Sequence, residues 1–190
     1  HASDFATDEL ARARARQQHG FADHEIVVLF VGRLSLHAKA NPLPMYLACA
    51  RAARASGILP IVRCFEADIA RSLDAGASGI KVPMVQSPEQ AQRIAERIRY
   101  PRPAGQAGMA GLRGSAFSTR AAGYGAFGGP GHTDRSNEHL GLIVMLETPQ
   151  AIEAATEIAS VEGVDSVFIG PNDLAHAMGF ENRWQDPQVQ

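Results

Sequence analysis

The sequence predicts an α/β fold with parallel strands, and two observations favour an incomplete (β/α)8 TIM barrel. From residue 58 onward, short apolar runs rich in β-branched residues alternate with segments of helical character. Polar side chains follow several of these runs, at Arg63, Glu147 and Asp173, and barrel enzymes gather their chemistry at this end of the strands. A doubly wound sheet is the alternative, but no G-x-G-x-x-G motif follows a first strand.

Helical segments and apolar runs alternate along the first hundred residues. Turn residues such as His19-Gly20 and Ala75-Gly76 separate them, as glycine commonly does at helix ends. We expect helices over residues 7–18, 45–55, 67–74 and 88–98. We expect strands over residues 26–31, 58–62 and 78–82, with a turn-rich loop over residues 32–44.

The second half of the chain opens with an irregular stretch and closes with a strand–helix–strand unit. Residues 100–137 hold many of the 18 glycines and one short helical candidate, residues 115–122. Strands are expected over residues 140–146 and 164–169. The helix between them begins with Thr148 as its N-cap and a proline at its first position.

Two carboxylates follow these last two strands. Glu147 comes directly after the first strand, and Asp173 follows the second within a Gly-Pro-Asn-Asp stretch. Adjacent parallel strands lie about 4.8 Å apart, so both acids are expected at one edge of the sheet. Two carboxylates at that distance repel each other unless a positive charge lies between them. The pattern therefore predicts a site for a divalent cation.

The composition argues against nucleic-acid and membrane partners. Charged residues make up 20% of the chain and the formal net charge is −2, so no bulk field attracts nucleic acid or an anionic membrane. No apolar run approaches the roughly 20 residues that span a bilayer. Cys49 and Cys64 lack metal-ligand spacing and are expected to be small buried residues. We expect a cytoplasmic protein.

From about residue 58 the sequence resembles the metal-dependent hydroxy-oxo-heptanedioate aldolase and citrate lyase β-subunit family. Six segments carry the resemblance, in order: 60–63 (PIVR), 72–85 (SLDAGASGIKVPMV), 99–101 (RYP), 112–114 (LRG), 143–148 (IVMLET) and 161–174 (VEGVDSVFIGPNDL). The resemblance implies a (β/α)8 barrel and a carbon–carbon lyase. The implied reaction cleaves a 2-keto-4-hydroxy acid to pyruvate, or a related 2-oxo acid, and an aldehyde. It also implies a homo-oligomer.

The resemblance assigns roles to individual residues. Glu147 and Asp173 would ligate Mg²⁺, Mn²⁺ or Co²⁺, and Arg63 would hold the substrate near its keto oxygen. Asp74 matches an acid that pairs with a catalytic histidine. The substrate carboxylate would be received by the backbone of Gly170, Pro171, Asn172 and Asp173.

The N-terminal part of the chain departs from this pattern. The Asp-Gly-Glu-His type stretch that carries the family's catalytic histidine is absent, and His37, His132, His139 and His176 are weak substitutes. Instead, the LFVGRL stretch with Arg33 and the nearby Lys39 resembles retaining glycosyltransferases of the GT-B fold. We therefore expect two parts, residues 1–56 and a partial aldolase barrel over residues 57–190. A nucleotide-sugar glycosyltransferase fragment and a non-catalytic chimera are the alternative functions.

Overall fold

The structure of the chain is a computed structural model. It describes residues 14, 17, 28–33, 52–53, 57–105, 107–109, 111–115, 118–119, 121–126, 131–181 and 183–189.

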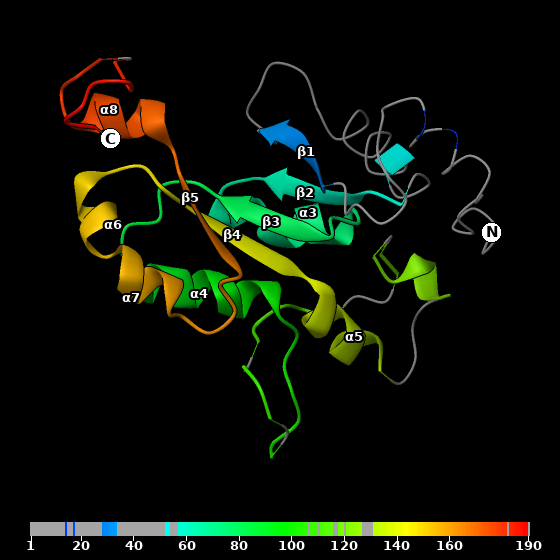
Figure 1. The fold of residues 1–190 in the computed structure, drawn as a ribbon. Coiled ribbons are helices and arrows are strands. Elements are labelled where there is room, and N and C mark those ends of the chain that lie inside the picture. The colour runs from blue at the N-terminus through cyan, green and yellow to red at the C-terminus, as the bar shows by residue number, and fades with distance from the viewer. Residues whose placement is uncertain are drawn as a thin grey trace.

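Within the described residues, the strands form one sheet in which every neighbouring pair is parallel. The order of the strands in the sheet equals their order in the chain (Figure 1). The strands are β1 (Val28–Arg33), β2 (Leu59–Arg63), β3 (Gly79–Val82), β4 (Gly141–Leu146) and β5 (Ser166–Ile169).

Helices return the chain from the end of one strand to the start of the next. The helices are α3 (Ile69–Asp74), α4 (Pro88–Ile98), α5 (His132–His139), α6 (Pro149–Glu153), α7 (Ala155–Ala159) and α8 (Pro171–Ala177), with 3₁₀ turns η2 (Glu66–Asp68) and η3 (Gly123–Gly125). None of the described helices is long and apolar enough to cross a membrane.

The register of the sheet sorts its residues onto two faces. Val62, Ile80 and Leu142 lie beside one another across β2, β3 and β4 and are fully buried. Their face packs against α3, α4, α6 and α7 in a single apolar core. Because these helices all cover one face, the chain winds in one direction, as in a barrel. A doubly wound sheet would carry helices on both faces.

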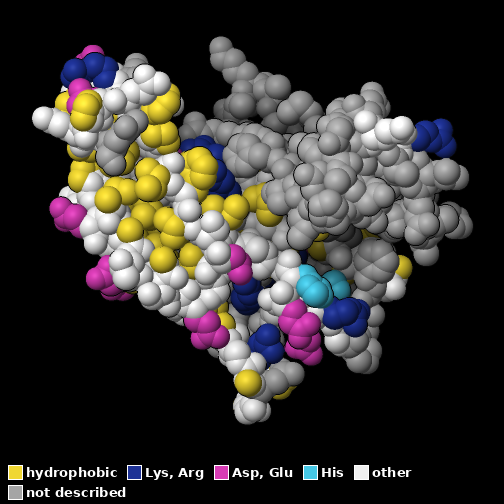
Figure 2. Space-filling model, viewed as in Figure 1, with side chains coloured by type: hydrophobic (Ala, Val, Ile, Leu, Met, Phe, Trp, Pro, Cys, Tyr) yellow, Lys and Arg dark blue, Asp and Glu magenta, His cyan; other side chains and the backbone are white. Residues whose placement is uncertain are grey.

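The next residue along each strand points to the opposite face of the sheet, because side chains alternate between faces. Arg63 lies beside Lys81 in the register, and Met145 lies beside Phe168. This face therefore carries charged side chains among apolar ones. β5 is one of the two edge strands of the described sheet, and Phe168 is 43% exposed there. Figure 2 shows hydrophobic side chains gathered over this edge and α8.

The expected strands are confirmed to within two residues, and helix 88–98 is confirmed as α4. Ser87 caps α4, since its side chain accepts a hydrogen bond from the Gln90 N–H, and Thr148 caps α6 in the same way. The single helix expected after Thr148 is wrong. Ala154, at φ −90° and ψ 12°, departs from helical geometry and divides the segment into α6 and α7.

Two helices were missed by the pattern and one candidate is wrong. α5 is polar throughout and has no apolar stripe to signal it. α8 begins directly after Gly170 and is only seven residues long. The described residues of the candidate helix 115–122 form turns and irregular backbone instead. Of the helices expected over residues 7–18 and 45–55, only residues 14, 17, 52 and 53 are described, and all four are helical.

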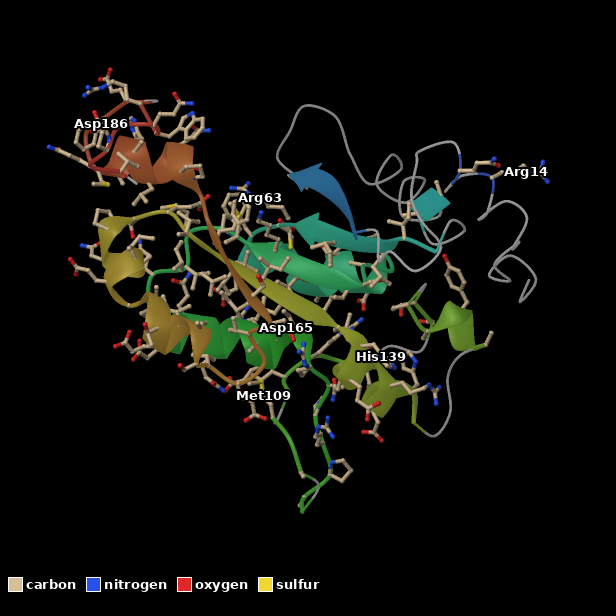
Figure 3. The ribbon with its side chains drawn as sticks, in the orientation of Figure 1. Arg14, Arg63, Met109, His139, Asp165 and Asp186 are labelled. Atoms are coloured by element: carbon tan, nitrogen blue, oxygen red, sulfur yellow. The ribbon has the colours of Figure 1, made fainter. Side chains whose placement is uncertain are left out.

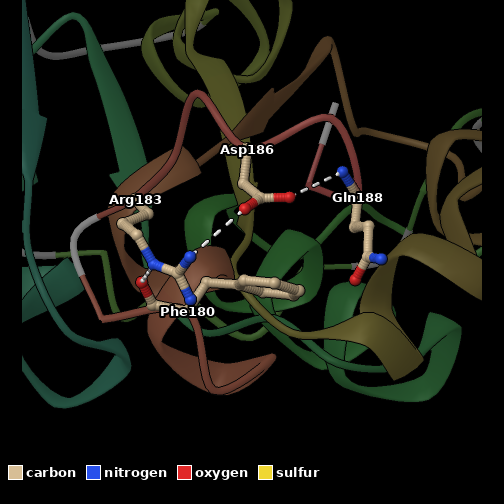
Figure 4. A network of polar contacts seen from close by, with 4 residues as sticks. All are labelled: Phe180, Arg183, Asp186 and Gln188. Carbon is tan, nitrogen blue, oxygen red and sulfur yellow. Dashed lines mark hydrogen bonds and ion pairs between the residues drawn. The ribbon is translucent and has the colours of Figure 1, made fainter.

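The segment after α8 is held by a short polar network. Arg183 donates through Nε to the Phe180 carbonyl at 3.2 Å and through Nη1 to Asp186 at 3.5 Å. Asp186 also accepts from the Gln188 N–H at 3.1 Å (Figure 4). Asp186 thus has a structural role in its own turn.

We expect Leu142→Ala to lower the free energy of unfolding by about 2–5 kcal/mol, because a fully buried leucine at the centre of the sheet leaves a cavity. Leu112→Ala removes the same atoms from a side chain that is 69% exposed and should change stability by about 0.5 kcal/mol or less. Urea unfolding of both variants measures the difference. Equal losses would contradict the assignment of the core.

Candidate functional site

The carboxyl edge of the sheet holds a buried carboxylate. Glu147 follows β4 directly and is 1% exposed. Its Oε2 accepts a hydrogen bond from the Met84 N–H at 2.7 Å. Its Oε1 is buried and has no hydrogen-bond partner. One half of this carboxylate is therefore fixed by backbone, while the other half is oriented toward the site.

A glycine makes room for this side chain. Gly170 follows β5, and its N–H donates to the Leu146 carbonyl at 2.9 Å, which continues the pairing of β4 and β5. A Cβ at Gly170 would lie 2.6 Å from Glu147 Cγ and 2.9 Å from Oε1. Such distances are shorter than van der Waals contact, so residue 170 can only be glycine while Glu147 keeps this position.

Asp173 lies next to Glu147, as the strand pattern predicted. It stands in the first turn of α8 and is exposed to solvent. Burial is the largest cause that raises the pKa of Glu147, and the nearby Asp173 raises that pKa further. The Met84 N–H and the charge of Arg63 oppose the shift. A buried carboxylate whose ionisation is disfavoured by a neighbouring acid is a site that a cation would stabilise.

Arg63 supplies a positive charge to the same carboxylate. It is the last residue of β2, and its Nη2 lies 3.6 Å from Glu147 Oε1. Its Nε donates to the sulfur of Met145 at 3.3 Å. Figure 3 shows Arg63 at the carboxyl end of β2, with His139 at the opposite end of the sheet. The structure therefore brings Arg63, Glu147 and Asp173 together, as expected from the sequence.

Lys81 is a charged residue of this face that the sequence reasoning missed. It lies beside Arg63 in the register of β2 and β3 and is 8% exposed. Its Nζ is 3.0 Å from the centroid of the Phe168 ring. Burial lowers the pKa of Lys81, and the charge of Arg63 lowers it further, while Glu147 opposes both. The available signal was a lysine inside an otherwise apolar strand, two positions from Gly79 on the same face.

Asp74 lies in a different cluster. It ends α3, shortly before β3 begins, so it is near the amino edge of the sheet. Its carboxylate pairs with Arg113 at 2.9 Å, and the Arg113 guanidinium lies 4.4 Å from the Tyr100 ring centroid. His132 packs beside Tyr100, with ring centroids 5.9 Å apart. The structure does not bring Asp74 to Glu147, and a shared role is not supported by its position.

The other residues considered from the sequence lie in several places. Pro171 and Asn172 are exposed at the start of α8, where Asn172 and Asp173 are the backbone donors because proline has no N–H and the Gly170 N–H bonds within the sheet. His139 ends α5 and His176 is exposed on α8. His37, Cys49 and Lys39 lie outside the described residues, as does the side chain of Arg33. Cys64 is buried, as expected.

The donor set suits a hard divalent cation. No three metal-binding side chains of the His, Cys, Asp and Glu types come together among the described residues. Glu147 and Asp173 supply two carboxylates, one with a buried and unpartnered oxygen. Mg²⁺ and Mn²⁺ are commonly held by one or two carboxylates, with water and substrate oxygens in the remaining positions. The residues present therefore fit such an ion.

Comparisons with known proteins agree with this geometry. The sequence model of the HpcH/HpaI aldolase/citrate lyase family matches residues 44–190. The hydroxypyruvate/pyruvate aldolase of Sagittula stellata is 41% identical over 122 residues, which cover 64% of this chain and 45% of that protein. The 2-keto-3-deoxy-L-rhamnonate aldolase of Salmonella gallinarum is 37% identical over 134 residues, which cover 69% of this chain and 47% of that protein.

A solved structure supports the fold. The crystal structure of an HpcH/HpaI aldolase/citrate lyase family protein from Burkholderia cenocepacia superposes with a TM-score of 0.76 at 28% identity, covering 96% of this chain and 67% of that one. The expected barrel fold is thereby confirmed. The chain spans about half the length of the curated relatives it matches.

The pH dependence of stability should report the buried carboxylate. Since the pKa of Glu147 is raised above 4.5, the metal-free protein should lose stability as the pH rises from 4.5 through the raised value. Glu147→Gln removes this titration but keeps an oxygen for the Met84 N–H. In EDTA, urea unfolding between pH 4.5 and 8 should show wild type losing stability relative to the variant. Parallel curves would contradict the burial of an ionisable group there.

Gly170→Ala should destabilise the protein by about 1–3 kcal/mol, because the new Cβ would collide with the Glu147 side chain. Gly114→Ala is the matched control, since a Cβ there meets nothing within 4 Å. Thermal or urea unfolding compares the two variants. If both alanines are tolerated equally, Glu147 does not occupy the described position.

Proposed function

Since the chain belongs to the HpcH/HpaI aldolase/citrate lyase family, we propose that its site holds a divalent cation and cleaves a carbon–carbon bond. The substrate would be a 2-keto-4-hydroxy acid, and the products would be pyruvate, or a related 2-oxo acid, and an aldehyde. The names of the relatives, a hydroxypyruvate/pyruvate aldolase and a 2-keto-3-deoxy-L-rhamnonate aldolase, support this substrate class.

The proposal depends on one observation, the burial of Glu147 with an unpartnered carboxylate oxygen. A carboxylate that is 1% exposed, with one oxygen lacking a hydrogen bond, is costly to bury without a counter-charge. Arg63 offers only a contact at 3.6 Å, and the neighbouring Asp173 adds repulsion. A cation between Glu147 and Asp173 would remove both costs. Hard oxygen ligands favour Mg²⁺ or Mn²⁺, and Co²⁺ is the remaining candidate.

Each residue of the site has a function in this reaction. When bound, the cation supplies Lewis-acid polarisation of the keto oxygen. Arg63 places a fixed positive charge where the negative charge of the enolate develops. Its position is set by Met145 and Glu147, so little reorganisation is needed during the reaction. The N–H groups of Asn172 and Asp173 at the start of α8 would receive the substrate carboxylate.

Two expectations from the sequence have no part in this chemistry. Asp74 is left out because it pairs with Arg113 near the amino edge of the sheet. The glycosyltransferase alternative depends on Arg33 and Lys39, whose side chains are not described, and nothing in the described residues favours it. Self-association stays a prediction.

Manganese binding tests the two proposed ligands. Isothermal titration with Mn²⁺ should show one site in wild type and at least a tenfold weaker one in Glu147→Gln and in Asp173→Asn, because each substitution removes a charged ligand. Asp186→Asn is the control, since that aspartate is bound within its own turn (Figure 4). Unchanged affinity in either ligand variant would refute the assignment.

Loss of Arg63 should affect the reaction more than binding of the metal. Pyruvate release from a 4-hydroxy-2-oxo acid, dependent on Mn²⁺ and lost in EDTA, gives the activity. Arg63→Ala should lower kcat/KM by about 100- to 1000-fold, as expected when one donor to a developing oxyanion is removed. Mn²⁺ affinity should stay within a few-fold. Activity that persists in EDTA would contradict the proposed class of reaction.

A further inference from the structure

Lys81 is a buried charged residue on the face of the site that has no part in the proposed chemistry. β3 is buried along its whole length, and Lys81 is its only charged residue. The side chain projects from the same face as Arg63, since the two residues are register partners on neighbouring strands. A strand buried on both faces normally reads as a continuous apolar run. A lysine in such a strand costs free energy of desolvation.

The two cationic side chains lean across the sheet in the same direction. Arg63 starts on β2 and reaches Met145 on β4, so it crosses β3. Lys81 starts on β3 and reaches the Phe168 ring on β5, so it crosses β4. Met145 and Phe168 are register partners. The guanidinium of Arg63 therefore lies at Met145 and the ammonium of Lys81 lies at Phe168. Both groups are level with the position two residues before Glu147 in the chain, one on the β2 side of β4 and one on its β5 side.

The charges around the proposed cation do not balance. Arg63 and Lys81 give +2 and Glu147 and Asp173 give −2, so these four side chains sum to zero before a divalent ion binds. A divalent ion raises the sum to +2. Lys81 and Glu147 interact electrostatically on this face, since the charge of Glu147 raises the pKa of Lys81 against the lowering by burial and by Arg63. A site with this excess favours a ligand that carries two negative charges.

We propose that Lys81 is a specificity-determining residue, which through its electric field makes the metal-loaded site prefer a dianion over a monoanion. The inference rests on the proposed function. In the reaction, the dianion is a 2-oxo acid carboxylate whose keto oxygen has taken up the negative charge of the enolate. Lys81 acts without touching the ligand, because its ammonium lies against Phe168 and the residue is almost wholly buried. Arg63 supplies the contact and Lys81 the selectivity.

Oxalate and pyruvate are suitable probes. Oxalate is a planar dianion shaped like the enolate of pyruvate, whereas pyruvate itself is a monoanion. Binding of each to the Mn²⁺-loaded protein is measured by titration calorimetry in wild type, Lys81→Met and Lys81→Arg. Arg97→Met is the control for loss of a distant positive charge, since that side chain is 52% exposed and pairs with Glu66. Mn²⁺ affinity is measured separately in each variant.

Lys81→Met should weaken oxalate binding about tenfold and pyruvate binding about threefold, because the electrostatic energy scales with the charge of the ligand. The same variant should bind Mn²⁺ as tightly as wild type or more tightly, because a repelling cation is gone. Lys81→Arg should restore the preference for oxalate, and Arg97→Met should leave it unchanged. Opposite effects on oxalate and Mn²⁺ cannot come from a general loss of structure.

The inference is overturned if Lys81→Met binds Mn²⁺ but keeps the wild-type preference for oxalate, or if oxalate, pyruvate and Mn²⁺ all weaken together. The second result would show that Lys81 only packs its stem against Phe168. Should Lys81→Met fail to fold, Lys81→Gln is measured and interpreted in the same way. Wild type that binds no Mn²⁺ overturns the proposed function itself, and this result is visible before any Lys81 variant is made.

Discussion

The site depends on keeping one carboxylate, Glu147, out of water at the end of β4. The backbone N–H of Met84 fixes one oxygen, and the missing side chain at Gly170 leaves room for the other. This arrangement costs free energy in isolation, because burial and the nearby Asp173 both disfavour the ionised state. This cost is local, and the cation proposed to bind between the two carboxylates would offset it.

The alternation of side chains along parallel strands separates stability from chemistry. Positions such as Val62, Ile80 and Leu142 form the apolar core beneath the helices. The positions between them carry Arg63 and Lys81 on the opposite face. A charge placed one residue earlier or later would point into the core, at a cost of several kcal/mol. The same period that stabilises the sheet therefore positions the charged residues.

The amino edge of the sheet holds a second polar cluster with a structural character. Asn137 of α5 bonds both the N–H and the carbonyl of Tyr100, at 2.7 and 3.0 Å. Arg113 pairs with Asp74 and covers the Tyr100 ring. These contacts anchor the irregular region between α4 and β4 to the helix ends. Their position opposite Glu147 agrees with the general separation of stability and catalysis in barrel folds.

The sequence by itself determined the parallel strands, the cap at Thr148, and the meeting of Glu147 with Asp173. These features follow from local pattern, since an apolar run that ends in a polar residue fixes both a strand and its carboxyl end. Only the tertiary structure decided the partner of Asp74 and the position of Lys81 beside Arg63. The pairing of Asp74 with Arg113 could not be predicted from the sequence, because the two residues are remote along the chain. Lys81 was missed because the two faces of a buried strand cannot be told apart from its sequence. The register with neighbouring strands decides which face a residue occupies.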